Sequence, residues 1–325
     1  MLLGIDVGGT FTDAVVLRQG EVVAQAKRAT THDDVLQCVL AALDAVLQPG
    51  MAQELERVVI SSTIVTNALT EGSLPPVFLA IIAGPGMNVK GHLPVTPYYL
   101  SGYVDHRGKI TANIDWSRHQ ELLRRKGSGV CAVSGKFSVR NPKLEYQAEH
   151  ELKKCGYSKV FLGSELSGEL NFVRRCNSAY FSAQVYELFT RFCRRIERAL
   201  AERDISAPVH ILKADGGTLP LAAALQQPVE AVFTGPAASV LGIEALCAPK
   251  VNSISLDVGG TTTDIAFWEN GLPLMARKGA AVAGYPTAVR AFHMRSIGIG
   301  GDSRLHKTEN GYVVGPELSL IHISE

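Results

Sequence analysis

The sequence has little of what marks membrane, secreted or nucleic-acid-binding proteins. Its net charge is +1, which provides neither a basic surface for nucleic acid nor an acidic tail. No stretch approaches the roughly 20 apolar residues that span a bilayer, and the opening MLLGIDVGG resembles no signal peptide. The six cysteines form no CxxC pair, which argues against a disulfide framework or a zinc site. We therefore expect a cytoplasmic protein that acts on a small molecule, without nucleic-acid or membrane partners.

Apolar runs alternate with amphipathic segments, and a hydrophobic content of 46% is ample for a buried core. Three strands with glycine turns open the chain, and helices are predicted over residues 33–48 and 171–203. The Thr- and Asn-rich stretch 62–72 is interpreted as a turn. This alternation predicts an α/β protein with mixed sheets. Further strands are expected at 57–61, 77–83, 130–133, 159–162 and 209–213, and further helices at 142–155 and 235–247.

An internal repeat is the most informative feature. LLGIDVGGTFTDAVVLRQGEVVAQAKR aligns without a gap on SISLDVGGTTTDIAFWENGLPLMARKG, which places Asp6 on Asp257 and Asp13 on Asp264. Each copy ends an apolar strand, turns at Gly-Gly and opens a second strand. A single copy fits an ordinary tight hairpin, with glycine for positive φ and threonine for strand propensity. Two matched copies favour a shared function.

The chemistry of the repeat suits phosphate. Two glycines at a strand reversal let backbone N–H groups face an anion with no Cβ in the way, and threonine hydroxyls add donors. Magnesium is usually bound through few carboxylates together with phosphate and water, which suits Asp6 and Asp257. Asp13 and Asp264 are candidate proton acceptors, so all four aspartates are catalytic candidates. The predicted phosphate-binding residues are Gly8, Gly9, Thr10, Thr12, Gly259, Gly260, Thr261 and Thr263.

Paired hairpins of this kind resemble the phosphate loops of the actin, hexokinase and heat-shock ATPase superfamily. The order GIDVGGTFTD, ISSTIVTNALTEG, KADGGTLPL, VFTGPAASVLG and LDVGGTTTD is similar to the hydantoinase A/5-oxoprolinase family. The resemblance implies duplicated actin-like (ribonuclease H-like) domains with ATP and Mg²⁺ as cofactors. It also implies ATP-dependent opening of a cyclic amide, such as a hydantoin or 5-oxoproline, through phosphorylation of a carbonyl oxygen. Relatives serve instead as ATP-using subunits of ketone carboxylases, and many pair with a second hydantoinase-type subunit.

Two further glycine motifs fit the resemblance. Gly216 and Gly217 follow a strand, as in the superfamily's adenosine-binding segment, and are expected to approach the nucleotide. If so, the motif order looks permuted relative to actin. Gly300 and Gly301 correspond to a glycine-rich stretch of the family in which Asp302 replaces a glycine.

Relatives also place charged residues near the substrate just before the long helix, although a solvated helix entry is the commoner explanation for such residues. The residues concerned are Glu165, Glu169, Arg174 and Arg175.

The expected organisation is an N-terminal domain over residues 1–168 and the start of a second domain over 169–317. The last residues, 318–325, read LSLIHISE, which resembles a translated adapter remnant. The chain is therefore expected to be truncated, with an incomplete second domain, and inactive alone. Two other functions stay open: a sugar-type kinase, which shares DxGGT loops, and a nucleotide-binding subunit without turnover. The duplicated GGTxTD favours the hydantoinase type over the kinase.

Overall fold

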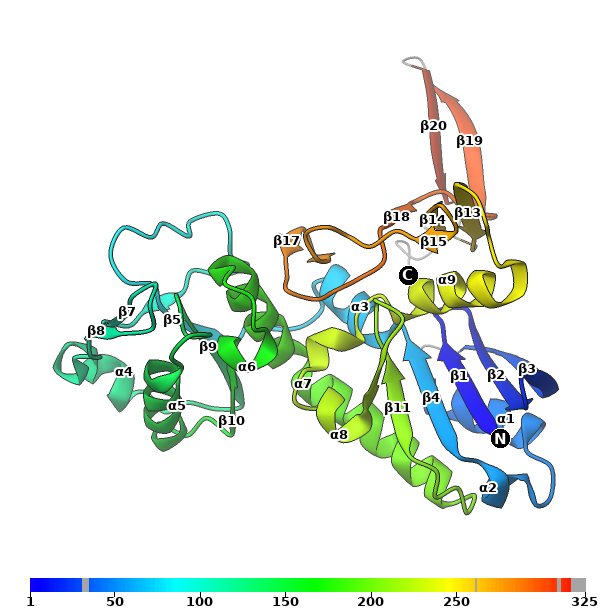
Figure 1. Ribbon diagram of the computed structural model, residues 1–325, viewed down its shortest axis with the longest axis horizontal. Helices are drawn as coiled ribbons and strands as arrows, with labels where there is room; N and C mark the ends of the chain where they lie inside the picture. The colour runs from blue at the N-terminus through cyan, green and yellow to red at the C-terminus, as the bar shows by residue number, and fades with distance from the viewer. Residues whose placement is uncertain (31–34, 261, 309–310, 317–325) are drawn as a thin grey trace.

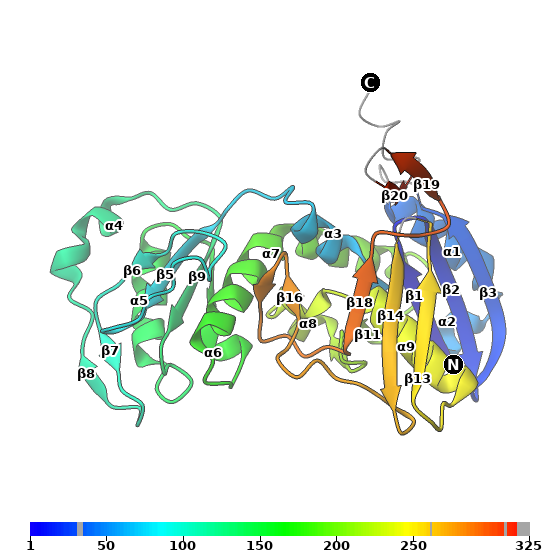
Figure 2. The same ribbon diagram turned by 90° about the horizontal axis from the view of Figure 1, so that it is seen from above.

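A computed structural model describes residues 1–30, 35–260, 262–308 and 311–316 (Figure 1). Thr261 and the tail 318–325, both named in the predictions above, lie outside these ranges. The described part confirms the α/β class with mixed sheets. One six-stranded sheet and one four-stranded sheet form two lobes joined by a long helix, and a third sheet lies above the first (Figures 1 and 2).

The first sheet is built around the opening meander. β1 and β2 pair antiparallel, as do β2 and β3, and β4 and β11 then extend the other side of β1 in parallel. This gives the order β12-β11-β4-β1-β2-β3. The strands are β1 (Leu2–Val7), β2 (Phe11–Arg18), β3 (Glu21–Ala29), β4 (Arg57–Ser62), β11 (Val209–Leu212) and β12 (Thr218–Pro220). The neighbouring helices are α1 (Val35–Val46), α2 (Met51–Glu54), α3 (Ile64–Thr70) and α8 (Leu221–Ala224).

The turn predicted at 62–72 is wrong, because helix α3 occupies most of it. Val65, Ala68 and Leu69 are buried at helical spacing, so packing outweighs the low helix propensity of the β-branched residues around them. The hydroxyl of Thr70 donates to the carbonyl oxygen of Thr66 at 2.9 Å, which lets a polar side chain sit within the helix.

The second lobe is a parallel sheet in the order β10-β9-β5-β6. All six residues of β9 are buried, as expected for a parallel strand covered on both faces. The strands are β5 (Phe78–Ile82), β6 (Tyr98–Tyr99), β9 (Val130–Gly135), β10 (Lys159–Leu162) and the hairpin β7 (Tyr103–Val104) with β8 (Ile110–Ala112). The helices are the 3-10 turn Trp116–His119, α4 (Gln120–Arg124), α5 (Lys143–Lys154) and α6 (Gly163–Leu166).

A buried polar cluster lies at the carboxyl end of β9. Arg175 is fully buried, which excludes a solvated helix entry for this residue, and its guanidinium donates to the carbonyl oxygen of Gly135 at 2.7 Å. Glu145, also buried, accepts from the Gly135 N–H at 2.6 Å and from the hydroxyls of Ser138 and Ser164. The cluster therefore joins α5, α6 and the start of the long helix to the end of β9.

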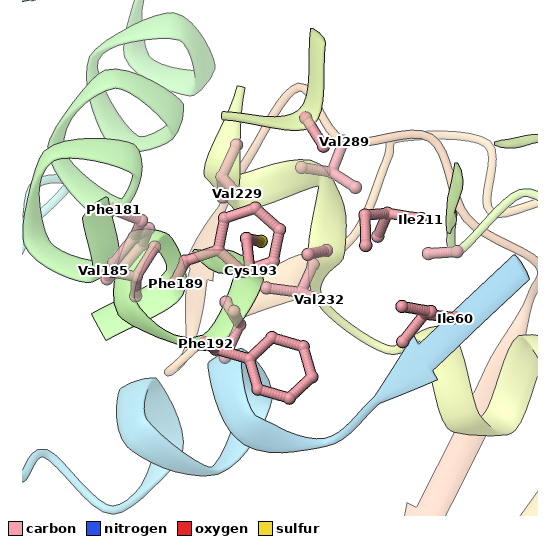
Figure 3. Close-up of a cluster of buried hydrophobic side chains, with 14 of the residues drawn as sticks. Ile60, Phe181, Val185, Phe189, Phe192, Cys193, Ile211, Val229, Val232 and Val289 are labelled. Atoms are coloured by element: carbon pink, nitrogen blue, oxygen red, sulfur yellow. The ribbon is translucent and has the colours of Figure 1, made fainter. Parts of the chain in front are cut away.

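The long helix α7 (Phe172–Ala201) runs for 30 residues, close to the predicted range. The helix packs on β9 and β10 of the second lobe and on α1 and α3 of the first lobe. Figure 3 shows Phe189 and Cys193 of this helix beside Val229 and Val232, with Ile60 and Ile211 of the first sheet nearby. One core thus continues from α7 into the six-stranded sheet.

The third sheet contains the second copy of the repeat. Helix α9 (Thr234–Cys247) lies between this sheet and the first one (Figure 1). Trp268 of β14 packs on α9 and donates its indole N–H to Glu244 at 2.9 Å. The third sheet consists of β13 (Ser253–Val258), β14 (Thr263–Glu269), β15 (Leu272–Pro273) and β18 (Met294–Ile297). Two separate two-stranded sheets follow, β16 (Ala281–Val282) with β17 (Tyr285–Pro286) and β19 (Ser303–Thr308) with β20 (Gly311–Pro316), and a 3-10 turn spans Pro228–Ala231.

The two copies differ sharply in burial. In β1, the apolar side chains that alternate with Asp6 belong to the main core. No described helix covers their counterparts on β13. These side chains are exposed at 65% for Ile254, 63% for Leu256 and 61% for Val258.

We expect the 325-residue chain to self-associate through this face of β13, because exposed contiguous apolar surface favours association. Leu256→Lys should lower the average mass in analytical ultracentrifugation at micromolar concentrations. Val22→Lys is the matched control, since Val22 is 55% exposed but lies on β3 of the first sheet. A wild-type chain that is monomeric and melts cooperatively would contradict the expectation.

Candidate functional site

The repeat forms two hairpins with the same pairing. In the first, Asp6 of β1 lies opposite Asp13 of β2, and in the second, Asp257 of β13 lies opposite Asp264 of β14. Strand alternation then places each pair of carboxylates on the face of its sheet that is turned toward α9. Sequence reasoning identified all four residues, and the structure brings them to the two sides of one helix.

The turns of the hairpins also match. The N–H of Gly8 donates to the carbonyl oxygen of Phe11 at 2.9 Å, and the N–H of Gly259 donates to that of Thr262 at 2.9 Å. A Cβ on Gly8 would lie 2.9 Å from the Phe11 oxygen, closer than side chains tolerate. The turn itself therefore requires glycine at position 8, and at Gly259 a Cβ would make a tighter contact with the Thr262 oxygen, at 3.2 Å, than most side chains do.

Near its first turns, helix α9 is tied to the end of β4, which pairs with β1, and to the second hairpin. Thr234, which is buried, donates its hydroxyl to the carbonyl oxygen of Ser62 at 2.9 Å and accepts from the Ser62 N–H at 2.8 Å. Ser239 donates its hydroxyl to the carboxylate of Asp257 at 2.6 Å. Nothing in the sequence assigns a role to the hydroxyl of Ser239. Thr234 lies directly before the helix predicted at 235–247, and this position is the one sequence feature that could have identified it.

Asp6 is the most perturbed carboxylate of the first hairpin. Burial raises its pKa, the carboxylates of Asp13 and Asp257 raise it further, and a hydrogen bond from Ser61 and the charge of Lys27 lower it. Its Oδ1 atom is buried and has no hydrogen-bond partner among the described atoms. A buried carboxylate oxygen without a partner suits the water shell of a cation, so this donor set fits Mg²⁺.

No group of three His, Cys, Asp or Glu side chains within the described ranges is arranged to hold a metal ion. Magnesium at this site would therefore take its remaining ligands from phosphate and water, which is its usual mode of binding.

The glycine-rich turn at 298–303 supports the second hairpin. The N–H of Gly301 donates to the carbonyl oxygen of Gly259 at 2.8 Å, and that of Asp302 donates to Gly260 at 2.8 Å. A Cβ on Gly300 would collide with the backbone of Gly260. The carboxylate of Asp302 also approaches Gly260, which adds negative charge at this hairpin.

The predicted threonines divide into two groups. Thr12 is fully buried and its hydroxyl lies 3.0 Å from that of Thr30, while Thr263 donates its hydroxyl to the carbonyl oxygen of Ile299 at 2.5 Å. Both hydroxyls are turned into the protein and hold the hairpins in place. Thr10 at the tip of the first hairpin is exposed.

The Asp215-Gly216-Gly217 turn lies against the third sheet. Gly216 has a φ of +83°, and a Cβ there would lie 2.8 Å from the ring of Phe292. Just before the turn, Lys213 forms ion pairs at 3.2 Å with both Asp215 and Glu230. Burial raises the pKa of Glu230, and the charge of Lys213 lowers it. Sequence reasoning did not identify this triad.

A cavity lies beside each hairpin. The first, of about 330 Å³, is lined by Gly8 and Gly9 with the polar side chains of Asn67 and Glu71. The second, of about 310 Å³, lies beside Asp264 and has mainly apolar walls.

Asp264 lies between two neighbours, Asp257 on β13 and Ser296 on β18. Burial raises the pKa of Asp264 and the Asp257 carboxylate raises it further, whereas a hydrogen bond from Ser296 lowers it. We expect carboxyl ¹³C NMR to show a pKa for Asp264 above the usual value of about 3.9. Ser296→Ala should move it higher still, so that Asp264 ionises only at a higher pH.

Asp105 is the internal control for this titration, because backbone N–H groups of Lys109 and Arg107 lower its pKa. If Asp264 titrated at or below Asp105, burial would not control its ionisation.

Gly300→Ala should displace the second hairpin, because the new Cβ meets the Gly260 backbone. Backbone strain of this kind costs about 1–3 kcal/mol, which should appear as a lower midpoint in urea unfolding. Gly298→Ala is the matched control in the same turn, since nothing lies within 4 Å of its Cβ position. Equal midpoints for the two variants would show that the turn does not support the hairpin.

The fold and the paired hairpins define the class of protein, a duplicated actin-like ATPase fold. Residues 2–156 match the family profile described as the hydantoinase/oxoprolinase N-terminal region, and residues 175–323 match that described as hydantoinase/oxoprolinase. The chain belongs to the hydantoinase/oxoprolinase family.

Individual relatives agree with this assignment. The chain is 26% identical to the caprolactamase subunit alpha of Pseudomonas jessenii over 97% of its own length and 50% of that protein. It is 24% identical to the 5-oxoprolinase of Saccharomyces cerevisiae, over 61% of the chain and 15% of that enzyme. The chain spans about half the length of the caprolactamase subunit and a smaller part of the oxoprolinase.

Two solved structures share the fold. Nucleotide-free acetone carboxylase aligns with a TM-score of 0.80 at 20% identity, over 98% of this chain and 51% of the other. The ATP-dependent caprolactamase of Pseudomonas jessenii aligns with a TM-score of 0.73 at 23% identity, over 97% and 50%.

Proposed function

We propose that this chain is the nucleotide-binding part of an ATP-dependent hydrolase that opens a cyclic amide. The observation that carries the proposal is the placement of two matched Asp-Val-Gly-Gly hairpins on either side of α9, with four carboxylates directed toward one helix. Membership of a family that includes an oxoprolinase and a caprolactamase supports a cyclic amide as the substrate class. ATP is the proposed phosphoryl donor.

The residues of the hairpins would have different roles in binding phosphate and magnesium. Backbone N–H groups around Gly8–Gly9 and Gly259–Gly260 would bind the phosphates, together with the hydroxyl of Thr10 and, by the sequence repeat, that of Thr261. Asp6 and Asp257 would hold water on Mg²⁺, which supplies charge neutralisation for phosphoryl transfer when it is bound. Positioning and electrostatics account for most of the catalysis of such transfers.

The proposed reaction balances with two waters. The amide N–H proton passes to an aspartate, and the carbonyl oxygen takes the phosphoryl group as its bond to ADP breaks. Water then adds to the activated carbon, and the ring C–N bond breaks as the aspartate returns its proton to the nitrogen, which leaves an acyl phosphate. A second water hydrolyses this acyl phosphate to the carboxylate and free phosphate. The sum is ATP, cyclic amide and two waters to ADP, phosphate and an open-chain amino acid.

Asp264 is the better proton acceptor of the two candidates. Asp13 is neutralised in part by Lys27 at 3.4 Å. Asp264 has no ion pair with any described cation, and burial raises its pKa toward the range in which a carboxylate serves as a base.

Other parts of the function are proposed from relatives. A name such as caprolactamase subunit alpha implies further subunits, and we propose a second hydantoinase-type subunit for this protein. None of the described helices is long and apolar enough to cross a membrane. We propose a cytoplasmic location.

Asp6→Asn and Asp257→Asn should each reduce lactam-dependent ATP turnover by about 10²–10³-fold in the full protein, the range for losing one group that stabilises the transferred charge. Asp44→Asn is the control, because Asp44 pairs with Arg203 on the far side of α1 and should leave turnover unchanged. The measurement is ADP release in the presence of Mg²⁺. Undiminished turnover in both hairpin variants would contradict the proposal.

A further inference from the structure

The cavity beside Asp264 is the most specific unassigned feature of the site. It lies at the start of α9, between Phe233 and Pro236 on one side and a ribbon formed by residues 274–293 on the other. Its volume of about 310 Å³ exceeds that of a five- to seven-membered ring. Its polar groups are few: Asp264, Ser296 and His293.

Backbone hydrogen bonds shape this cavity. The N–H of Ala276 donates to the carbonyl oxygen of Ala291 at 2.9 Å, and that of Ala280 donates to Val289 at 2.8 Å. The N–H of Phe292 donates to the carbonyl oxygen of Ala214 at 2.9 Å, which anchors the ribbon to the end of β11. The alanine walls are therefore formed before any ligand binds.

The opposite wall is held in an unusual conformation. Phe233 has a φ of 54°, the left-handed region that side chains rarely adopt. Its N–H donates to the hydroxyl of Thr66 at 2.8 Å, which fixes it against α3. Strained residues of this kind concentrate at ligand sites, and here the strain presents an aromatic ring to the cavity.

The charged side chains that line the cavity determine which ligand charge it accepts. Of the described residues that line it, none is Lys or Arg, and Asp264 is the only carboxylate. A ring with a carboxylate substituent would meet this negative charge without a Lys or Arg side chain in the lining to bind it. A neutral ring could pack on the alanines and on Phe233 while its N–H faces Asp264.

We infer that this cavity binds the ring of an uncharged cyclic amide and discriminates against an anionic one. The inference rests on the proposed function, which supplies the amide as substrate. Asp264 places the ring on the same hairpin as Gly259 and Gly260, so the ring and the phosphates share one structural element.

The test compares 5-oxoproline with its carboxamide, which share the ring and are nearly the same size but carry a charged and a neutral substituent respectively. With the full protein, lactam-dependent ADP release should have a kcat/KM at least about tenfold higher for the carboxamide. A preference for 5-oxoproline would overturn the inference while leaving the proposed function intact. ATP turnover that no lactam stimulates would instead contradict the proposed function.

Two variants and one control test whether this cavity causes the preference for the carboxamide. Ala276→Leu should fill the cavity and raise KM for the carboxamide at least about tenfold with unchanged ATP affinity, whereas Ala112→Leu, exposed on β8, should change neither. Ala281 lies on the exposed rim of the cavity. Ala281→Lys should reduce the preference for the carboxamide over 5-oxoproline, because the new ammonium group can bind the carboxylate of 5-oxoproline.

Ligand-observed NMR with 2-pyrrolidinone gives a readout that does not require turnover. Binding that Ala276→Leu abolishes and Ala112→Leu preserves supports the inference. Binding that is absent in the wild type, or unaffected by Ala276→Leu in a variant whose thermal unfolding is normal, overturns it.

Discussion

Like charges brought together around one helix are the constraint on which the site depends. Asp6 and Asp257 face α9 from two different sheets, and the charge of Asp257 raises the pKa of both Asp6 and Asp264. Lys27, itself exposed, is the only described cation that forms an ion pair with any of the four carboxylates. Such a cluster is electrostatically unfavourable until a cation arrives, which is the condition expected of a site for magnesium and phosphate.

The rest of the fold serves to hold these carboxylates in place. Thr234 connects the start of α9 to β4 beside the first hairpin, and Ser239 connects it to the second hairpin. The close contact of Gly216 with Phe292 joins the end of β11 to the ribbon at 274–293. Substitutions at these contacts should act on both hairpins together. Because the links are backbone contacts and short hydroxyl groups, they leave little freedom for one hairpin to move without the other.

The sequence predicted the structure in most detail where the chain contains its internal repeat. The hairpins, the opening meander and α7 follow from local pattern alone, and the parallel strands follow from apolar runs. Helix α3 was missed because its threonines and asparagine were interpreted as a turn signal, although Val65, Ala68 and Leu69 already had helical spacing. Arg175 was interpreted as exposed because sequence does not show that Gly135 and Glu145 lie beside it. The alanine-walled ribbon at 274–293 carries no periodic signal, since its strands are two residues long and its backbone bonds join distant positions.

The two copies of the repeat are alike in sequence and unlike in environment, and in the proposed function this difference would give them separate roles. In the first copy, β3 continues for nine residues and brings Lys27 to Asp13. In the second, β15 ends after two residues, and the aligned Lys278 falls in the ribbon, where no ion pair links it to Asp264 within the described chain. Asp264 instead faces Ser296 and a largely apolar cavity. The shortening of one strand thus leaves a carboxylate without a counterion beside a space of substrate size, which supports the second hairpin as the side of the site where the amide would lose its proton.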